Sequence, residues 1–307
     1  MTAEKSNHEQ TDEGGGGNQS PKTQAMYARI IETIFFDHYR KGLREFEFDR
    51  EEIEATANEL YRKKEIALKK PKNLGDVIYS FRHRRPLPPA VLATQSEDRS
   101  WIILGAGDAK YRFRLNKLAH IKPRRGLTVT KIPDATPEII LEHALNDEQA
   151  LLAKMRYNRM IDIFLGLTAY SLQNHLRTKI PNYGQIEIDE LYVGLDRNGA
   201  QYIIPVQAKG PRDTLGAIQT IQDVTFCKTP RPSKSKIFKK DYVDLQCRAV
   251  SAQSFKDGSS EIIAMFELAF DGSEVSIEGE RHYSLVPADE ITKSDLSAYA
   301  RGRKGRT

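Results

Sequence analysis

Two runs of alternating apolar residues on either side of Asn198-Gly199 form the clearest pattern in the chain, GQIEIDELYVGLDRNGAQYIIPVQAKG from Gly184 to Gly210. Successive residues of a strand point to opposite faces of a sheet. In the second run this alternation puts Gln207 and Lys209 on one face. The other face is apolar and consists of Tyr202, Ile204, Val206 and Ala208. We therefore predict a β-hairpin over residues 184–210.

The turn decides which residues of the two strands lie opposite each other. A two-residue Asn-Gly turn would reverse one face, whereas a three-residue loop, 197–199 with Gly199 left-handed, keeps the apolar faces together. Counting back from this loop places Asp189 opposite Gln207 and Glu187 opposite Lys209, and puts Ile186 and Ile188 on the apolar face. A register shifted by one would exchange Asp189 for Glu190. Otherwise Glu190 points towards the core, where its charge needs a partner.

Hydrophobic periodicity places further elements on both sides of the hairpin. Helices are expected over 25–40, from Asp49 as N-cap through 61, from Asn73 or Asp76 to about 85, and over 137–153, 157–177 and 213–227. Strands are expected over 101–104, 111–115, 243–250 and 261–270, with an edge strand over 282–286. The proline-rich segment 131–137 marks a domain boundary.

Composition adds a compartment and a class of partner. The chain has 307 residues, a net charge of +5 and only two cysteines, Cys227 and Cys247, without metal-ligand spacing. It has no apolar run long enough for a membrane span and no signal segment, so we expect a cytoplasmic, prokaryotic-type protein without a membrane partner. Basic clusters, including Arg82 to Arg85, suit a polyanion such as DNA or are solvated surface.

The N-terminal elements, three helices followed by a hairpin, resemble winged-helix DNA-binding domains. This resemblance implies that the third helix enters the major groove, with Arg82, Arg84 and Arg85 as DNA-binding candidates. The expected organisation is a disordered tail (1–24), a winged-helix-like recognition domain (25–133), a catalytic domain (134–288) and a basic mobile tail (289–307).

The order helix, acid-bearing strand, turn, strand ending Gln207-Ala208-Lys209, helix, strand is similar to the core of the PD-(D/E)XK nuclease superfamily, over about residues 157–270. The resemblance implies an α/β (α+β) restriction-endonuclease-like core with a mixed central sheet flanked by helices. Asp189 stands at the family's aspartate and Lys209 at its lysine. Gln207 replaces the acidic residue, a variant that occurs within the superfamily.

Phosphodiester hydrolysis accounts for these residue types, because a bound Mg²⁺ can activate water and neutralise charge. Asp189, the Gln207 side-chain oxygen and the Ala208 carbonyl are the expected metal ligands. Lys209 would orient the attacking water, and Glu187 is an additional catalytic carboxylate or a partner of Lys209. Gln219 and Gln222, on the following helix, face DNA or the site, or are ordinary polar surface.

The resulting hypothesis is a Mg²⁺-dependent, sequence-specific endonuclease of double-stranded DNA, most like a type II restriction enzyme. A homodimer and a cognate DNA methyltransferase are the partners it suggests. The alternatives are an inactive nuclease-like DNA-binding regulator, which Gln207 keeps open, and a structure-specific repair nuclease.

Overall fold

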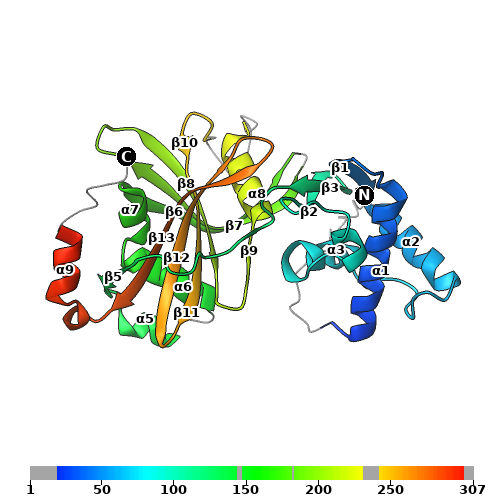
Figure 1. Cartoon of the computed structure of the whole chain (residues 1–307). Helices are drawn as coiled ribbons and strands as arrows, with labels where there is room; N and C mark the ends of the chain where they lie inside the picture. Colours follow the sequence, from blue (N-terminus) through cyan, green and yellow to red (C-terminus); the bar gives the residue numbers. More distant parts are fainter. Residues whose placement is uncertain (1–18, 144–146, 182, 231–241, 301–307) are drawn as a thin grey trace, which may run out of the picture. The chain divides into compact units, whose positions relative to one another are not determined.

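The computed structural model describes residues 19–143, 147–181, 183–230 and 242–300. The chain divides into two compact units, Met1–Leu115 and Asn116–Thr307 (Figure 1). This division comes earlier than the expected boundary after residue 133. The reason is that β5 (Val129–Pro133) pairs in parallel with β13 (Val275–Val286) and so belongs to the sheet of the second unit.

Both expected tails contain helix. Helix α1 (Pro21–His38) begins before residue 25, because Ser20 caps it by accepting a 3.2 Å hydrogen bond from the Thr23 N–H. Near the other end, α9 (Lys293–Ala300) follows the 3₁₀ turn η2 (Ala288–Glu290), and the Thr292 N–H donates to the Asp295 carboxylate at 2.9 Å. Residues 1–18 and 301–307 of the expected tails lie outside the described residues.

The first unit combines helices with a small antiparallel sheet of strand order β1-β3-β2. Its remaining elements are β1 (Glu45–Asp49), α2 (Arg50–Arg62), α3 (Leu74–Tyr79), the π-helical turn η1 (Ser80–Arg84), α4 (Pro89–Leu92), β2 (Ser100–Gly107) and β3 (Lys110–Asn116). The expected caps are present. Glu52 accepts a 2.7 Å hydrogen bond from the Asp49 N–H, and Asn73 accepts one of 2.7 Å from the Gly75 N–H.

Strand β1 was not among the predicted elements, although its sequence EFEFD alternates strictly. Its buried Phe48 faces the core, while Glu45 and Glu47 pair across the strands with arginines of β3. The Arg114 Nε donates to Glu45 at 3.0 Å. Alternating aromatic and charged residues therefore give β1 one face for the core and one for cross-strand ion pairs.

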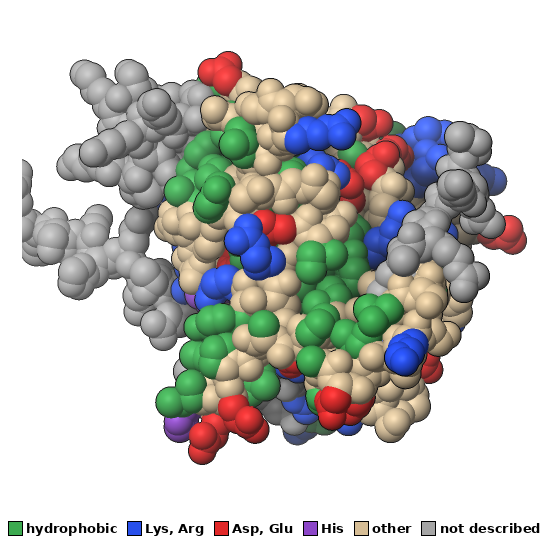
Figure 2. Space-filling view, turned by 90° about the vertical axis from the view of Figure 1, so that its left-hand side faces the viewer, with side chains coloured by type: hydrophobic (Ala, Val, Ile, Leu, Met, Phe, Trp, Pro, Cys, Tyr) green, Lys and Arg blue, Asp and Glu red, His purple; other side chains and the backbone are tan. Residues whose placement is uncertain are grey.

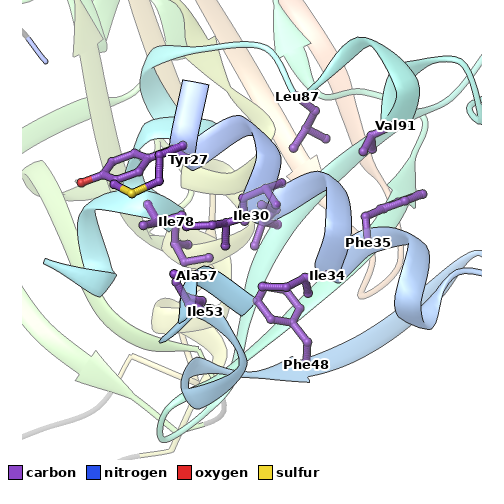
Figure 3. Packing of buried hydrophobic residues seen from close by; sticks show 14 of the residues in the cluster. Tyr27, Ile30, Ile34, Phe35, Phe48, Ile53, Ala57, Ile78, Leu87 and Val91 are labelled. Carbon is purple, nitrogen blue, oxygen red and sulfur yellow. The ribbon is translucent and has the colours of Figure 1, made fainter. Parts of the chain in front are cut away.

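The core of the first unit is built around the apolar stripe of α1 (Figure 3). Ile30, Ile34 and Phe35 are completely buried and meet Ile53 and Ala57 from α2. Burying one such large apolar side chain contributes about 1.5–3 kcal/mol. The apolar side chains that recur every three or four residues along α1 therefore stabilise this unit by packing, and helix propensity contributes less.

The second unit has a mixed sheet of strand order β5-β13-β12-β11-β8-β7-β6, with β10 also paired to β8. Its other elements are β4 (His120–Ile121), α5 (Glu138–His143), α6 (Asp147–Tyr157), α7 (Met160–Leu165), β6 (Thr168–Ile180), β7 (Gly184–Leu195), β8 (Gln201–Lys209), β9 (Leu215–Gly216), α8 (Ala217–Lys228), β10 (Gln246–Cys247), β11 (Ala249–Asp257) and β12 (Ser260–Phe270). Strands β8 and β11 are parallel and are connected through α8. The segment 282–286 belongs to β13, which lies between β12 and β5 and is not an edge strand.

Helices cover both faces of this sheet. Leu151 and Leu152 of α6 share a buried cluster with Ile204 of β8, whereas Phe226 of α8 shares another with Ile203. Adjacent residues of a strand face opposite ways, so α6 and α8 lie on opposite faces. The expected mixed central sheet flanked by helices is confirmed.

The predicted helix over 157–177 is wrong for most of its length. Helix α7 ends at Leu165, where Gly166 adopts a left-handed conformation with φ +68°. The chain then enters β6, which pairs antiparallel with β7 from Thr168 to Ile180. Pairing along such a long strand outweighs a helical periodicity that the sequence carries only weakly.

The predicted hairpin and its three-residue loop are confirmed. Gly199 has φ +85°, and the Asp196 N–H donates to the Ala200 carbonyl at 3.1 Å. Paired residues run from Leu195↔Gln201 to Glu190↔Val206. Beyond that pair the expected alternation fails, because Ile186 and Ile188 pack with Ile203 and Phe226 rather than with Val206 and Ala208.

Strand β6 and the helices before it expose apolar side chains. The exposed residues are Ile139, Leu141, Tyr157, Ile163, Tyr170 and Leu172. Hydrophobic patches between charged side chains are also visible on the face of the molecule in Figure 2. Among the described residues no helix is both long and apolar enough to cross a membrane.

Candidate functional site

Asp189 lies on β7 immediately before Glu190, which is the first residue of this strand to pair with β8. Its Oδ2 accepts a 2.8 Å hydrogen bond from the Ala208 N–H. Burial raises the pKa of Asp189 to about 6, although the Lys209 ammonium and the Ala208 N–H act in the opposite direction. Asp189 is thus a largely desolvated carboxylate whose negative charge is incompletely compensated.

Lys209, the last residue of β8, turns towards α6. Its Nζ donates to the Glu148 Oε1 at 2.7 Å, and its side chain is only 18% exposed. Burial acts to lower the pKa of Lys209, but attraction to Asp189 and the hydrogen bond to Glu148 outweigh burial and raise the pKa. Two carboxylates from different elements therefore hold one ammonium group in its charged state.

Glu148 was not predicted as a site residue. It lies in the first turn of α6, where an acidic residue is favourable in any helix because it interacts with the helix dipole. Nothing in the sequence distinguishes that role from a role in the site. Only the fold brings α6 next to the end of β8.

Gln207 is buried, and its amide group makes three hydrogen bonds within the protein. The Nε2 donates to the Glu187 carbonyl at 3.0 Å and to the Asp223 Oδ1 at 3.2 Å, while the Oε1 accepts a 3.3 Å hydrogen bond from Gln219. Burial raises the pKa of Asp223 well above its usual value. A carboxylate at position 207 would lie next to the buried Asp223 carboxyl group and be repelled by it when ionised. A glutamine avoids this repulsion and can donate a hydrogen bond to Asp223. Ala208, the other expected ligand besides Asp189, is also buried and pairs with Ala252 of β11.

Glu187 does not pair with Lys209 as expected. Its Oε1 lies 3.2 Å from the Arg177 Nε and 3.8 Å from the His175 Nδ1, both on β6. The cause is that the β7–β8 ladder ends at Glu190, which leaves Lys209 free to turn to α6. Glu187 instead pairs with its neighbour on the other side, Arg177.

Glu190 has the partner that its burial requires. Its carboxylate is 1% exposed, forms an ion pair with Arg156 of α6 and accepts a hydrogen bond from the Tyr192 hydroxyl. The two acids therefore differ in their partners, since Asp189 accepts from the Ala208 N–H whereas Glu190 is held in a buried ion pair.

The two glutamines of α8 differ in their surroundings. Gln219 donates to Gln207 and so supports the buried side of the site, whereas Gln222 is only 8% exposed. The prediction that Gln222 contacts DNA is not supported by this burial, because nine-tenths of the residue is shielded by the fold.

The three arginines proposed for DNA contact also differ. Arg82 turns inward, where its Nε donates to the Ile103 carbonyl at 2.9 Å and burial lowers its pKa to about 10. Arg84 stacks over Tyr79 at 4.6 Å and faces Asp76 at 3.5 Å. Arg85 continues the chain after η1 and is partly exposed. Arg82 is thus less accessible for a direct DNA contact than Arg84 and Arg85, because its guanidinium turns into the first unit.

Asp189 and Glu148 are of the side-chain type that Mg²⁺ takes as ligands, whereas the predicted ligands Gln207 and Ala208 are buried within the protein. Within the described ranges there is no group of three or more His, Cys, Asp or Glu side chains that could hold a metal. Mg²⁺ commonly needs only one or two carboxylates and takes its other ligands from water and phosphate. Asp189 and Glu148, which both interact with the same ammonium group, supply two.

Asp189→Asn is expected to stabilise the metal-free protein at neutral pH. The pKa of Asp189 lies above its usual value of 3.8, so the folded protein binds this proton more tightly than the unfolded chain does. Ionisation of Asp189 therefore lowers the free energy of unfolding. This loss grows between pH 4 and pH 6 and stays the same at higher pH. We expect a gain of up to about 3 kcal/mol at pH 7.5 that vanishes near pH 4. Urea unfolding in EDTA at both pH values measures it, and an equal gain at both would contradict the explanation.

The chain matches no protein-family model, and searches of curated proteins and of solved structures also find no match.

Proposed function

We propose that the second unit is a Mg²⁺-dependent nuclease that hydrolyses double-stranded DNA. The observation that carries this proposal is the charge group of Asp189, Lys209 and Glu148, in which a desolvated carboxylate interacts electrostatically with a lysine at the end of paired strands. A perturbed carboxyl group beside a specific charge partner is typical of functional sites. The strand–helix–strand connection from β8 through α8 to β11 supports the resemblance to PD-(D/E)XK nucleases.

Each side chain has a task in this proposal. The Lys209 ammonium, held in place by Glu148, interacts with the negative charge that develops on the phosphoryl oxygens. The Ala208 N–H fixes the orientation of the Asp189 carboxylate. Gln207 stabilises the buried side of the site, because its amide group donates hydrogen bonds to both the Glu187 carbonyl and the buried Asp223 carboxyl group.

Asp189 and Glu148 would hold the metal ion. When bound, Mg²⁺ supplies charge neutralisation at the phosphate and lowers the pKa of a bound water. This assignment replaces Gln207 and the Ala208 carbonyl by Glu148, because both predicted ligands are buried among protein contacts.

The first unit would recognise DNA. Its order of helices and strands, α1-β1-α2-α3-β2-β3 with the short turns η1 and α4 before the hairpin, supports the winged-helix-like interpretation. Arg84 and Arg85 remain the candidates for contacts to phosphate or guanine. Sequence-specific cleavage as in type II restriction, with a homodimer on the DNA and a partner methyltransferase, is the version of this proposal that we favour.

Digestion of unmethylated phage DNA tests the proposal. With Mg²⁺ we expect discrete bands, which would indicate sequence specificity, and with EDTA no cleavage. A smear would retain the nuclease and exclude restriction, and preferential cleavage of branched DNA would indicate a repair enzyme. Intact DNA with both Mg²⁺ and Mn²⁺ would exclude the nuclease.

One observation favours a second candidate, a DNA-binding regulator without catalysis. Gln207 is neutral and engaged within the protein, and the described residues hold no group of three or more His, Cys, Asp or Glu side chains that could bind a metal here. Sequence-specific binding of DNA without cleavage in either metal would support this candidate.

A further inference from the structure

We propose that His175 and Arg177 of β6 bind a backbone phosphate of duplex DNA beside the site, and that Glu187 occupies this position in the free protein. The inference rests on the proposed function, because it describes how the same site would hold its substrate. It assigns Glu187 a role that differs from the catalytic one expected from the sequence.

The first argument is the backbone at His175. In the β6–β7 ladder, Asn174 pairs with Glu190 and Leu176 pairs with Ile188, so His175 lies level with Asp189 but is left out of the pairing. Its φ of +48° is left-handed, a conformation that is uncommon and unfavourable for a residue with a side chain. Such strain is concentrated at functional sites.

The second argument is the convergence of two donors on one oxygen. The Glu187 Oε1 lies 3.2 Å from the Arg177 Nε and 3.8 Å from the His175 Nδ1. On its other side, the His175 Nε2 lies 2.8 Å from the Gln149 Nε2 of α6. Because an amide nitrogen only donates, the His175 Nε2 accepts this hydrogen bond, which leaves Nδ1 as the donor that faces the Glu187 oxygen.

The third argument is exposure. The side chains of His175, Arg177 and Glu187 are 51%, 65% and 43% exposed. Ion pairs this open to water contribute little to stability, so a stronger anion can replace the carboxylate at low cost. A phosphate is such an anion, because an arginine can bind it through two parallel hydrogen bonds.

The fourth argument is the charge around the reaction centre. The negative charges of Glu148 and Glu187 both act to raise the pKa of Asp189. Lys209 alone cannot attract a polyanion to three carboxylates. The Arg177 guanidinium supplies the missing attraction once Glu187 has moved away, and the His175 ring adds a hydrogen-bond donor at Nδ1.

Binding of a fluorescein-labelled double-stranded oligonucleotide, measured by anisotropy in EDTA over a salt series, tests this proposal. Glu187→Gln should tighten binding about fivefold, because it removes a competing and repelling charge. Arg177→Ala should weaken binding about fivefold and reduce the slope of log K against log salt by about one. His175→Asn should also weaken binding, and asparagine tolerates the left-handed conformation.

Glu261→Gln is the matched control for charge. Glu261 is 50% exposed and also pairs with a basic residue, Lys154, at 2.6 Å. We expect its substitution to change affinity by less than about twofold. Equal effects of Glu187→Gln and Glu261→Gln, an unchanged salt slope in Arg177→Ala, or no binding by the unaltered protein would each overturn the inference.

The binding assay separates this inference from the proposed function, because it contains no metal and needs no cleavage. DNA that stays intact in Mg²⁺ and Mn²⁺, with the three affinity shifts present, would exclude the nuclease and retain the phosphate site. If cleavage occurs, Glu187→Gln should lower KM about fivefold, in line with the tighter binding. A KM that stays unchanged or rises would overturn the inference.

Discussion

Lys209→Ala is expected to reduce the rate of DNA cleavage by about 10²–10³-fold, the usual effect of removing one preorganised charged donor from a catalytic centre. The substitution removes the ammonium group that hydrogen-bonds to Glu148 and is attracted to Asp189. It also leaves two neighbouring carboxylates without the cation that compensates them. Single-turnover cleavage at saturating Mg²⁺ would measure the effect on the chemical step.

Lys154→Ala provides a control with closely matched surroundings. The Lys154 side chain is also 18% exposed, and its Nζ lies 2.6 Å from Glu261. It is located on α6, as is Glu148, but makes no contact with Asp189 or Lys209 among the interactions described above. We expect cleavage within about twofold of the unaltered protein. Equal losses in the two variants would mean that Lys209 acts through stability alone.

Phe35→Ala is expected to destabilise the first unit by about 3–5 kcal/mol. Phe35 is completely buried, and its ring contacts five other aromatic rings, including those of Phe46, Trp101 and Phe113. Truncation to alanine removes the transfer free energy of the ring and leaves a cavity where α1 meets the sheet. Since domains have only about 5–15 kcal/mol of stability, this loss is large.

Tryptophan fluorescence during urea unfolding reports on this unit alone. The chain has one tryptophan, and Trp101 lies in the same aromatic cluster. Phe36→Ala is the control, because Phe36 is the next residue of α1 but is 41% exposed. We expect it to cost about 1 kcal/mol or less. A loss below about 1 kcal/mol for Phe35→Ala would show that the surrounding side chains close the cavity.

Local rules predicted the elements that local interactions determine. Asn198-Gly199 and the alternation around it gave the correct hairpin and loop, and the capping residues Asp49 and Asn73 gave the starts of two helices. These features depend on residues within a few positions of one another. They can therefore be identified without knowledge of the rest of the chain.

The site depended on contacts that no local rule contains. Glu148 reaches Lys209 across 61 residues, and Glu187 finds its partners on β6, which was predicted to be helical. Apolar periodicity alone did not reveal that Gly166 ends α7 and that pairing with β7 makes the next segment extended. Predicting Asp189 and Lys209 required only the hairpin, whereas predicting their environment required the whole sheet.

The pairing of β5 with β13 has a consequence for the order of events during synthesis. Strand β5 is synthesised early in the second unit, but it can join the sheet only after synthesis of its partner β13, more than 140 residues later. The first unit is continuous in sequence, from Met1 to Leu115, and can therefore fold during translation of the second unit. A chain released before Val275 would carry a folded first unit and a sheet whose β12 edge is open, and unpaired edges of this kind promote aggregation.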